Sequence, residues 1–326
     1  MHAIRLHDFG PAGNLSYEEV PDPEPVPGQL RIAVAAAGVH LIDTTIRSGA
    51  QVGAFPLPEL PAIPGREVAG VVDALGPDVD EGWLGRRVVA HLGPASAGYA
   101  ELAVREADAV HPIPDGLADD AAVAMIGTGR TTVGILDDAK LTADDVVLVT
   151  AAAGGIGSLL VQAARHAGAT VVGVAGGEAK TALVRRLGAD VAVDYTAPEW
   201  PKLVREALGE RAVTVVLDGV GGELGRGAFD LAGMGGRVLV FGWSSGSPLE
   251  FGVFDLYREG LTVGVAIGPR LLRVPGALRA LETRSLAMAA EGWLEPVVDR
   301  FPLAEAAWAH AALESRATTG KVVLIP

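Results

Sequence analysis

The chain has 326 residues, 49% of them hydrophobic and 20% charged, so it can bury a substantial core and is long enough for two domains. Its formal net charge of −14 opposes binding to the phosphate backbone of nucleic acids. It contains no cysteine, which excludes disulfides and zinc sites built on thiolates. The apolar runs are too short to cross a membrane and residues 1–13 lack an apolar signal core, so we expect a cytoplasmic protein.

Residues 1–110 are predicted to be rich in β-strands. Short runs with many β-branched residues span 29–39, 67–76 and 85–92, and glycine or proline separates these runs. Such punctuation is typical of a compact antiparallel fold.

From residue 119 the pattern changes to alternating helices and strands. Residues 119–139 are predicted to be helical, and six short apolar strands follow at 145–150, 170–175, 190–195, 213–220, 236–242 and 261–266. Apolar strands that alternate with helices are buried on both faces, so the sequence predicts an α/β fold with a doubly wound parallel sheet. Helical patterns at 275–294 and 303–315 and a strand at 321–326 come last. Because six strands already complete the sheet, we expect this tail to return to the first domain.

A glycine-rich turn follows the first strand of the predicted sheet, in the stretch "VTAAAGGIGSLL". Aligned with the dinucleotide fingerprint GxGxxG, its three glycine positions are Ala152, Gly154 and Gly157. Gly154 would let the backbone approach a pyrophosphate, and Gly157 would let the helix pack closely on the strand. Gly155 and Ile156 lie at the helix N-terminus, whose amides and dipole attract phosphate. An ordinary tight turn is the alternative interpretation.

The second strand of the predicted sheet ends without an acidic residue. In NAD sites a carboxylate about 20 residues after the turn binds the ribose 2′-hydroxyl. Here the strand ends in Ala175, Gly176 and Gly177, and Lys180 follows. A 2′-phosphate would find room and a positive charge, so we expect NADPH rather than NADH. Lys180 as a solvated lysine at a helix start remains the alternative.

Several segments together resemble the zinc-independent quinone oxidoreductases (zeta-crystallin-like) of the medium-chain dehydrogenase/reductase superfamily. They are "AAAGVHLIDTTIRSGA", "PAIPGREVAGVV", "AGYAELAVREADAVHPIPDGL", "TAAAGGIGSLLVQAARHAGA", "LDGVGG", "GRVLVFGWSSG" and "LESRATTGKVVLIP". The resemblance implies a β-rich GroES-like catalytic domain formed by residues 1–120 and 266–326. It implies a Rossmann NADPH-binding domain at 121–265 and an active site in the cleft between the two. It also implies a homodimer or homotetramer assembled through the edge strand 261–266.

The resemblance assigns further residues to the cofactor. Those implied around the 2′-phosphate are Lys180, Tyr195 and Arg316, and those implied along the nicotinamide half are Thr131, Phe241, Gly242 and Ser244. Arg316 as a surface arginine is the alternative. Zinc-dependent relatives hold their metal with a cysteine near Val39 and a histidine at the position of Arg66. With neither residue present, we expect no metal.

The segment 38–49 is expected to face the nicotinamide and to supply the catalytic residues His40, Asp43 and Thr45. Family members commonly have asparagine at His40 and tyrosine at Thr45. His40 could donate a hydrogen bond to a carbonyl oxygen and can titrate near neutral pH, or it is a histidine satisfied by backbone. Asp43 is expected to orient its neighbours. Arg66 and Arg130 are interpreted as structural ion-pair partners.

A metal-free site suits an acceptor that is already a strong electrophile. Hydride transfer is the chemistry of the cofactor, and hydrogen bonds to a developing oxyanion suffice for a quinone. We therefore expect an NADPH-dependent reductase of quinones or similar activated carbonyls. The alternatives are an enoyl or alkenal reductase acting on an enone, which would need a general acid, and a non-enzymatic NADPH-binding protein.

Overall fold

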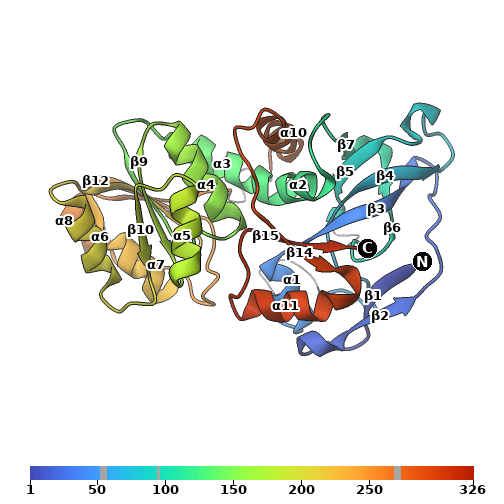
Figure 1. The fold of residues 1–326 in the computed structure, drawn as a ribbon, viewed down its shortest axis with the longest axis horizontal. Coiled ribbons are helices and arrows are strands. Elements are labelled where there is room, and N and C mark those ends of the chain that lie inside the picture. Colours follow the sequence, from blue (N-terminus) through green and yellow to red (C-terminus); the bar gives the residue numbers. More distant parts are fainter. Residues whose placement is uncertain (52–56, 94–95, 268–272) are drawn as a thin grey trace. The chain divides into compact units, whose positions relative to one another are not determined.

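The computed structural model describes residues 1–51, 57–93, 96–267 and 273–326. The chain divides into two compact units. The first unit contains residues 1–128, 285–290 and 296–326, and the second contains 129–284 and 291–295. Both chain termini lie in the first unit (Figure 1). The domain bounds expected from the sequence, 1–120 with 266–326 and 121–265, stay a prediction about functional domains.

A six-stranded, fully parallel sheet forms the centre of the second unit. Its strands in spatial order are β10 (Val191–Asp194), β9 (Thr170–Ala175), β8 (Val146–Val149), β11 (Val213–Asp218), β12 (Ala232–Val240) and β13 (Thr262–Val265). Since the chain enters at β8, winds outward to β10 and then returns past β8 to β13, the sheet is doubly wound. The predicted fold class is confirmed.

Helices cover both faces of this sheet because its strands are apolar on both sides. The helices are α3 (Arg130–Ala139), α4 (Gly155–His166), α5 (Glu178–Arg186), α6 (Trp200–Leu208), α7 (Gly222–Phe229) and α8 (Val253–Glu259). Val147 of β8 is buried in one core cluster with Leu160 of α4, whereas Leu148 is buried in a second cluster with Val204 of α6. Alternate residues of one strand therefore pack into the hydrophobic cores on opposite faces of the sheet.

The first unit contains a β-rich sheet and a separate hairpin. The sheet has the order β14 (Val298–Pro302), β15 (Lys321–Ile325), β3 (Gln29–Val39), β4 (Glu67–Leu75), β5 (Arg87–His91) and β7 (Val110–Pro112), with β6 (Leu102–Glu106) also paired to β3. The hairpin pairs β1 (His2–Leu6) with β2 (Leu15–Glu19). The C-terminal strand β15 runs antiparallel to β3, which confirms that the tail returns to the first part of the chain.

The remaining elements are short helices and two longer ones. The short helices are α1 (Leu41–Arg47), η1 (Ala12–Asn14), η2 (Glu81–Trp83), η4 (Ala107–Ala109) and η6 (Leu303–Glu305). The helix α11 (Ala306–Glu314) lies in the first unit, and α10 (Ala277–Ala290) contributes residues to both units.

The expected single helix over 119–139 is interrupted. It consists of α2 (Asp119–Ala124), a π-helical turn η5 (Met125–Gly129) and α3. π-Helical turns are rare and are frequent at functional sites. This turn holds Gly127, whose surroundings are described with the site below.

Candidate functional site

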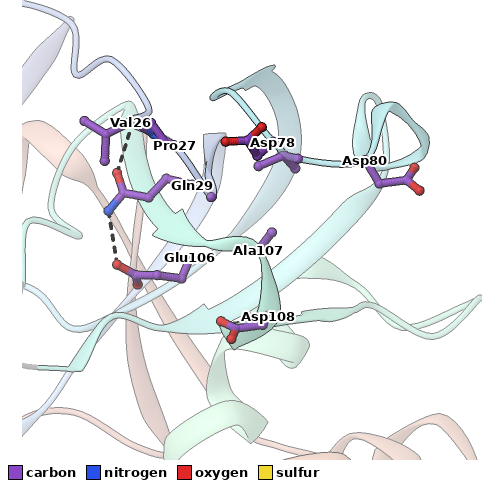
Figure 2. A pocket seen from close by; sticks show the side chains of 10 residues that line it. Val26, Pro27, Gln29, Asp78, Asp80, Glu106, Ala107 and Asp108 are labelled. Atoms are coloured by element: carbon purple, nitrogen blue, oxygen red, sulfur yellow. Dashed lines mark hydrogen bonds between the residues drawn. The ribbon is translucent and has the colours of Figure 1, made fainter.

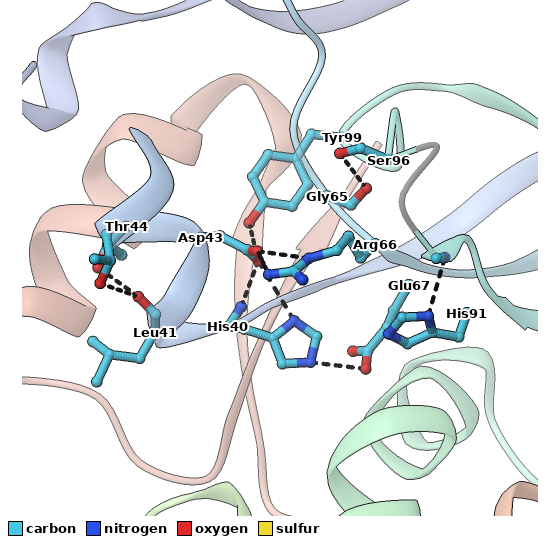
Figure 3. Close-up of polar contacts among 12 residues, drawn as sticks. His40, Leu41, Asp43, Thr44, Gly65, Arg66, Glu67, His91, Ser96 and Tyr99 are labelled. Atoms are coloured by element: carbon cyan, nitrogen blue, oxygen red, sulfur yellow. Dashed lines mark hydrogen bonds and ion pairs between the residues drawn. The ribbon is translucent and has the colours of Figure 1, made fainter. Parts of the chain in front are cut away.

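His40 stands at the start of α1, directly after β3 (Figure 3). The carboxylate of Asp43, three residues further on, accepts a hydrogen bond from the backbone N–H of His40 at 2.9 Å. A carboxylate in the first turn of a helix accepts hydrogen bonds from free backbone amides. It also interacts favourably with the positive end of the helix dipole. This cap explains why 41–47 forms a short helix that hydrophobic periodicity did not predict.

Asp43 is buried, and both of its carboxylate oxygens accept hydrogen bonds. Its Oδ1 accepts from Nη2 of Arg66 at 3.0 Å, and its Oδ2 accepts from the hydroxyl of Tyr99 at 3.1 Å. Burial raises the pKa of the Asp43 carboxyl, but the hydrogen bond and charge of His40 and the charge of Arg66 outweigh this and hold that pKa well below its usual range. Asp43 therefore orients side chains, as expected, and Arg66 is an ion-pair partner.

The hydroxyl of Tyr99 continues this network into the core of the first unit. It lies 3.2 Å from Nε2 of His310, and Nδ1 of His310 accepts from Nε of Arg47 at 3.3 Å. Because Arg47 can only donate and Tyr99 donates to Asp43, His310 must carry its proton on Nε2 and be neutral. Burial lowers the pKa of His310 to about 4, which agrees with this assignment. The hydroxyl proton of Tyr99 is therefore used in the hydrogen bond to Asp43.

A second set of contacts joins His40 to the sheet. Nε2 of His40 lies 2.8 Å from Oε1 of Glu67 at the start of β4, and Oε2 of Glu67 lies 2.7 Å from Nζ of Lys321 in β15. The Glu67 carboxylate has no exposed surface. Burial raises its pKa, but the charges of His40 and Lys321 prevail and hold the Glu67 pKa well below its usual range.

His40 is therefore held between two carboxylates. Its Nε2 faces Glu67, and its Nδ1 lies 3.5 Å from Oδ2 of Asp43. Burial by itself lowers the pKa of His40, but the charge of Glu67 and the contact with Asp43 raise it above its usual value. One quarter of the His40 side chain is exposed. Both ring nitrogens therefore lie near carboxylates, and the role of His40 in catalysis stays a prediction.

The other residues expected near the nicotinamide are more ordinary. Thr45 lies in α1, is half-buried, and its hydroxyl is 3.5 Å from the carbonyl oxygen of Leu41. Thr131 lies in α3 and is half-buried. Arg130 pairs with Glu282 at 2.8 Å, so it is an ion-pair partner as interpreted.

The glycine-rich turn of the second unit joins β8 to α4. Ala151, rather than the next residue, adopts the left-handed conformation with φ +46°, so Ala152 can replace the first glycine of the fingerprint. A Cβ on Gly157 would lie 2.8 Å from Cα of Ala152 and would overlap the carbonyl oxygen of Ala151. Gly154 is the N-cap of α4, and Gly155 and Ile156 begin the helix. The turn thus presents backbone amides at a helix N-terminus, which fits a pyrophosphate.

Tyr195 lies against the end of β9. A Cβ on Gly176 would lie 3.0 Å from the Tyr195 hydroxyl, so this glycine lets the ring pack closely against the backbone. Lys180 is half-buried in α5. Arg316 lies in the first unit and is exposed, with φ +59°.

The sequence did not indicate one acidic group at this end of the sheet. A carboxylate is present there, supplied by β10 instead of β9: Oδ1 of Asp194 accepts from the backbone N–H of Gly177 at 2.9 Å. It also accepts from the backbone and hydroxyl of Thr196. These hydrogen bonds, that from Gly177 foremost, lower the pKa of Asp194. The carboxylate is ionised and already occupied by local donors.

Further buried groups at the same edge of the sheet were not singled out from the sequence. Asp218, at the end of β11, accepts from the Thr150 hydroxyl at 2.8 Å and from the Gly221 amide at 3.1 Å. The Phe241 amide donates to the carbonyl oxygen of Asp218, and the Ser244 amide donates to that of Gly219. A Cβ on Gly242 would lie 3.0 Å from the Gly219 oxygen. The "LDGVGG" stretch carried the only sequence signal for Asp218.

A pocket in the first unit lies elsewhere, between β3, β6 and the loop around Asp80 (Figure 2). Its volume is about 460 Å³, and its lining includes the acidic residues Asp78, Asp80, Glu106 and Asp108. Four carboxylates would repel a phosphate-bearing cofactor, so we do not assign NADPH to it. Within the described ranges, no group of three or more His, Cys, Asp or Glu side chains is arranged to hold a metal. No helix among the described residues is long and apolar enough to span a membrane.

Comparison with known proteins matches both parts of the chain to one superfamily. A family model for the alcohol dehydrogenase GroES-like domain matches residues 26–115, and one for zinc-binding dehydrogenase matches residues 155–283. The chain is 32% identical to the quinone oxidoreductase of Pseudomonas aeruginosa over 99% of both chains. The chain belongs to the quinone oxidoreductase family of the medium-chain dehydrogenase/reductase superfamily.

Two further proteins that are similar to this chain carry different names. A 2-haloacrylate reductase of a Burkholderia species is 33% identical over 99% of this chain and 98% of its own. Escherichia coli quinone oxidoreductase, solved in complex with NADPH, superimposes with a TM-score of 0.87 at 29% identity and covers all of both chains. The β-rich GroES-like fold and the Rossmann-type sheet predicted from the sequence are both confirmed for this family member.

Proposed function

We propose that the protein is an NADPH-dependent oxidoreductase that transfers hydride to a quinone or a similar activated carbonyl. The observation that carries the proposal is in the second unit, where the glycine turn after β8 lies beside β9, and Gly176 and Gly177 directly follow the last residue of β9. A 2′-phosphate has room beside two glycines and attraction from Lys180. The quinone oxidoreductase relatives, one of them solved with NADPH, support the acceptor and the cofactor.

The residues that we assign to the cofactor form three groups. The amides of the turn residues Ala152, Gly154, Gly155, Ile156 and Gly157 would hold the pyrophosphate. The basic and aromatic side chains of Lys180, Tyr195 and Arg316, with Gly176 and Gly177, would hold the adenosine end. Thr131, Phe241, Gly242 and Ser244 would line the nicotinamide half. When bound, NADPH supplies the hydride.

His40 is the residue that we assign to the acceptor. Reduction of a quinone to its hydroquinone takes one hydride and one proton, and water can supply the proton. The electron pair that arrives with the hydride leaves negative charge on the acceptor oxygen. A positively charged imidazolium near that oxygen stabilises it without needing to give up its proton. Asp43 and Thr45 shape and orient this part of the site.

Reduction of an activated carbon–carbon double bond is the second candidate function. The observation that favours it is the identity to a 2-haloacrylate reductase. That reaction benefits from an acid that protonates the carbon next to the carbonyl group. Tyr99 does not suit this role, because its hydroxyl is buried and donates to Asp43. We therefore place this reaction second.

We also propose that the protein acts in the cytoplasm as a homodimer or homotetramer. The edge strand β13 and the neighbouring helix α8 expose large apolar side chains: Val265 is 70% exposed, Phe254 89% and Tyr257 79%. Exposed apolar side chains at an open sheet edge favour pairing with a second copy.

A steady-state panel tests the proposed reaction. Purified protein is given NADPH or NADH with 1,4-benzoquinone, a simple enone or 2-chloroacrylate, and absorbance at 340 nm is followed. We expect turnover of the quinone with NADPH and much less with NADH. Turnover of the enone or of 2-chloroacrylate without the quinone would establish the second candidate. Tight binding of NADPH with no turnover would indicate a binding protein instead.

A further inference from the structure

Glu67 is a fully buried carboxylate to which the proposed reaction assigns no role. Its two oxygens face two different cations, His40 at 2.8 Å and Lys321 at 2.7 Å. The Lys321 side chain is only 5% exposed. A carboxylate without water contact is costly unless cations or donors satisfy both oxygens. Here each oxygen lies at ion-pair distance from a different basic side chain, and one of these is the acceptor-side histidine.

Two glycines make room for this carboxylate. A Cβ on Gly38 of β3 would overlap Oε2 of Glu67, and a Cβ on Gly127 of the π-helical turn would overlap Oε1. The same Cβ on Gly127 would lie 3.4 Å from Nε2 of His40. The π-helical turn therefore brings bare backbone against the Glu67–His40 contact. The close packing fixes where the carboxylate can lie.

The geometry also favours a positively charged His40 ring. A neutral imidazole has one N–H and one lone pair, so one of its nitrogens would turn a lone pair toward a carboxylate. With Glu67 at Nε2 and Asp43 at Nδ1, only the doubly protonated ring faces attraction on both sides. Figure 3 shows His40 between these two carboxylates.

The charges around the ring balance except for that of His40. Glu67 and Asp43 are negative, and Lys321 and Arg66 are positive. Tyr99 is a neutral donor to Asp43, and His91, opposite Glu67 on β5, accepts a hydrogen bond on Nδ1 from the Gly93 amide. The proton on His40 thus leaves one net positive charge in the cluster. It sits on the most exposed of these five charged side chains.

We propose that Glu67, braced by Lys321, is a positioning residue that holds the His40 ring in place and keeps it positively charged for the acceptor oxygen. Glu67 itself does not touch the acceptor. This inference rests on the proposed function, since the charge matters only if negative charge develops nearby. Glu67 and Lys321 thereby join the residues that position His40 in the site.

The test measures the charge of His40 directly, by NMR titration of the ring in the whole protein. The His40 signal is identified by its loss in His40→Asn. In the unaltered protein His40 should titrate above the ordinary value of a histidine. In Glu67→Gln its pKa should fall by about one unit or more, because an adjacent opposite charge shifts a pKa by about 1–3 units. In Lys321→Met it should rise, because a nearby cation is gone.

Activity provides the second readout. The pH dependence of kcat/KM for 1,4-benzoquinone is measured, and its decline at alkaline pH should follow the pKa of His40. This decline should move to lower pH in Glu67→Gln and to higher pH in Lys321→Met. Glu67→Asp keeps the charge but withdraws the carboxylate, so kcat should fall with little movement of that decline. The matched control is Glu282→Gln, which removes a carboxylate paired with Arg130 at 2.8 Å in the second unit and should leave His40 unchanged.

The outcomes separate the two proposals. An ordinary or lowered His40 pKa in the unaltered protein would overturn the inference without any variant. So would shifts in the same direction for Glu67→Gln and Lys321→Met, or quinone turnover whose pH profile ignores both substitutions. If the titration behaves as expected but no quinone is reduced, Glu67 still holds and charges the His40 ring, but the proposed function, and with it the role of that charge toward an acceptor oxygen, falls.

Discussion

The end of the site that we assign to the adenosine contains charges of both signs. Lys180 in α5 supplies one positive charge, and Asp194 at the end of β10 supplies a negative one. Asp194 is occupied by the amides of Gly177 and Thr196, so it is poorly placed to accept from a ribose hydroxyl as well. Discrimination in favour of a 2′-phosphate then rests on the basic side chains.

Replacing those basic side chains should weaken NADPH selectively. Lys180→Ala and Arg316→Ala each remove a charge that we assign to the 2′-phosphate, and a hydrogen bond to a charged group contributes about 1.5–3 kcal/mol. We expect each variant to bind NADPH about tenfold or more weakly and NADH nearly unchanged, since 1.4 kcal/mol is about a factor of ten. Isothermal titration calorimetry measures both. Equal losses for the two nucleotides would contradict the assignment.

At the residue scale, the sequence indicated groups that lie close together along the chain, and their catalytic roles stay predictions. His40 and Asp43 were singled out because they lie in one short segment, and Asp43 does orient its neighbours. Glu67 and Lys321 were missed because they meet His40 only through the pairing of β3 with β4 and β15. Asp194 was missed for the same reason: its carboxylate reaches the end of β9 from the next strand.

At the scale of elements, the contact between the turn after β8 and α4 leaves no room for a side chain at Gly157. Gly157→Val would force the helix away from the turn, and overpacking of this kind costs about 1–3 kcal/mol. Both NADPH and NADH should lose binding, because the amides at the helix N-terminus would move together. Gly154→Ala is the graded comparison, since its Cβ would lie 3.2 Å from the Ala151 oxygen. Calorimetry that finds normal binding by Gly157→Val would refute the turn alignment.

We predict that copies of this chain assemble through the edge strand β13. If two copies meet through β13 and α8, then Val265→Lys combined with Phe254→Glu places charges in the contact and should give a single-chain particle. Light scattering after gel filtration measures the mass. The control is Trp308→Glu on α11, an exposed aromatic residue that should leave the assembly intact. An unchanged mass for the double variant would show that another surface is used.

Elements with a strong hydrophobic pattern were predicted well, and those set by polar contacts were not. The six strands of the parallel sheet and the returning C-terminal strand follow from apolar runs. The helix α1 was not predicted, since it depends on the Asp43 cap. The π-helical turn within 119–139 was not predicted either, because its local sequence continues a helical pattern while Glu67 fills the space beside Gly127.

For the whole molecule, the buried polar network predicts loss of stability in mild acid. Burial lowers the pKa of His310 from 6.5 to about 4. Between these values the unfolded chain binds a proton that the folded chain does not, so the stabilisation present above pH 6.5 is lost as the pH falls toward 4. This loss amounts to about 3 kcal/mol at most. Asp43 and Glu67, whose pKa values are lowered, add their losses at still lower pH.

Urea unfolding at pH 7, 5.5 and 4.5 checks this prediction. His310→Gln should be less stable than the unaltered protein at pH 7, because it loses the Tyr99 and Arg47 contacts. It should then lose less additional stability on acidification. His166→Gln, an exposed position on α4, should follow the unaltered protein throughout. Parallel losses for His310→Gln and the unaltered protein would show that His310 is not the titrating group.

We propose above all that this protein moves a hydride from NADPH to a quinone. The most direct measurement is an anaerobic single turnover, in which protein saturated with NADPH is mixed with a limiting amount of 1,4-benzoquinone. We predict that one NADPH is oxidised and one hydroquinone formed per quinone, with no semiquinone signal in electron paramagnetic resonance. NADPH that stays reduced, or a semiquinone product, would contradict hydride transfer to the quinone.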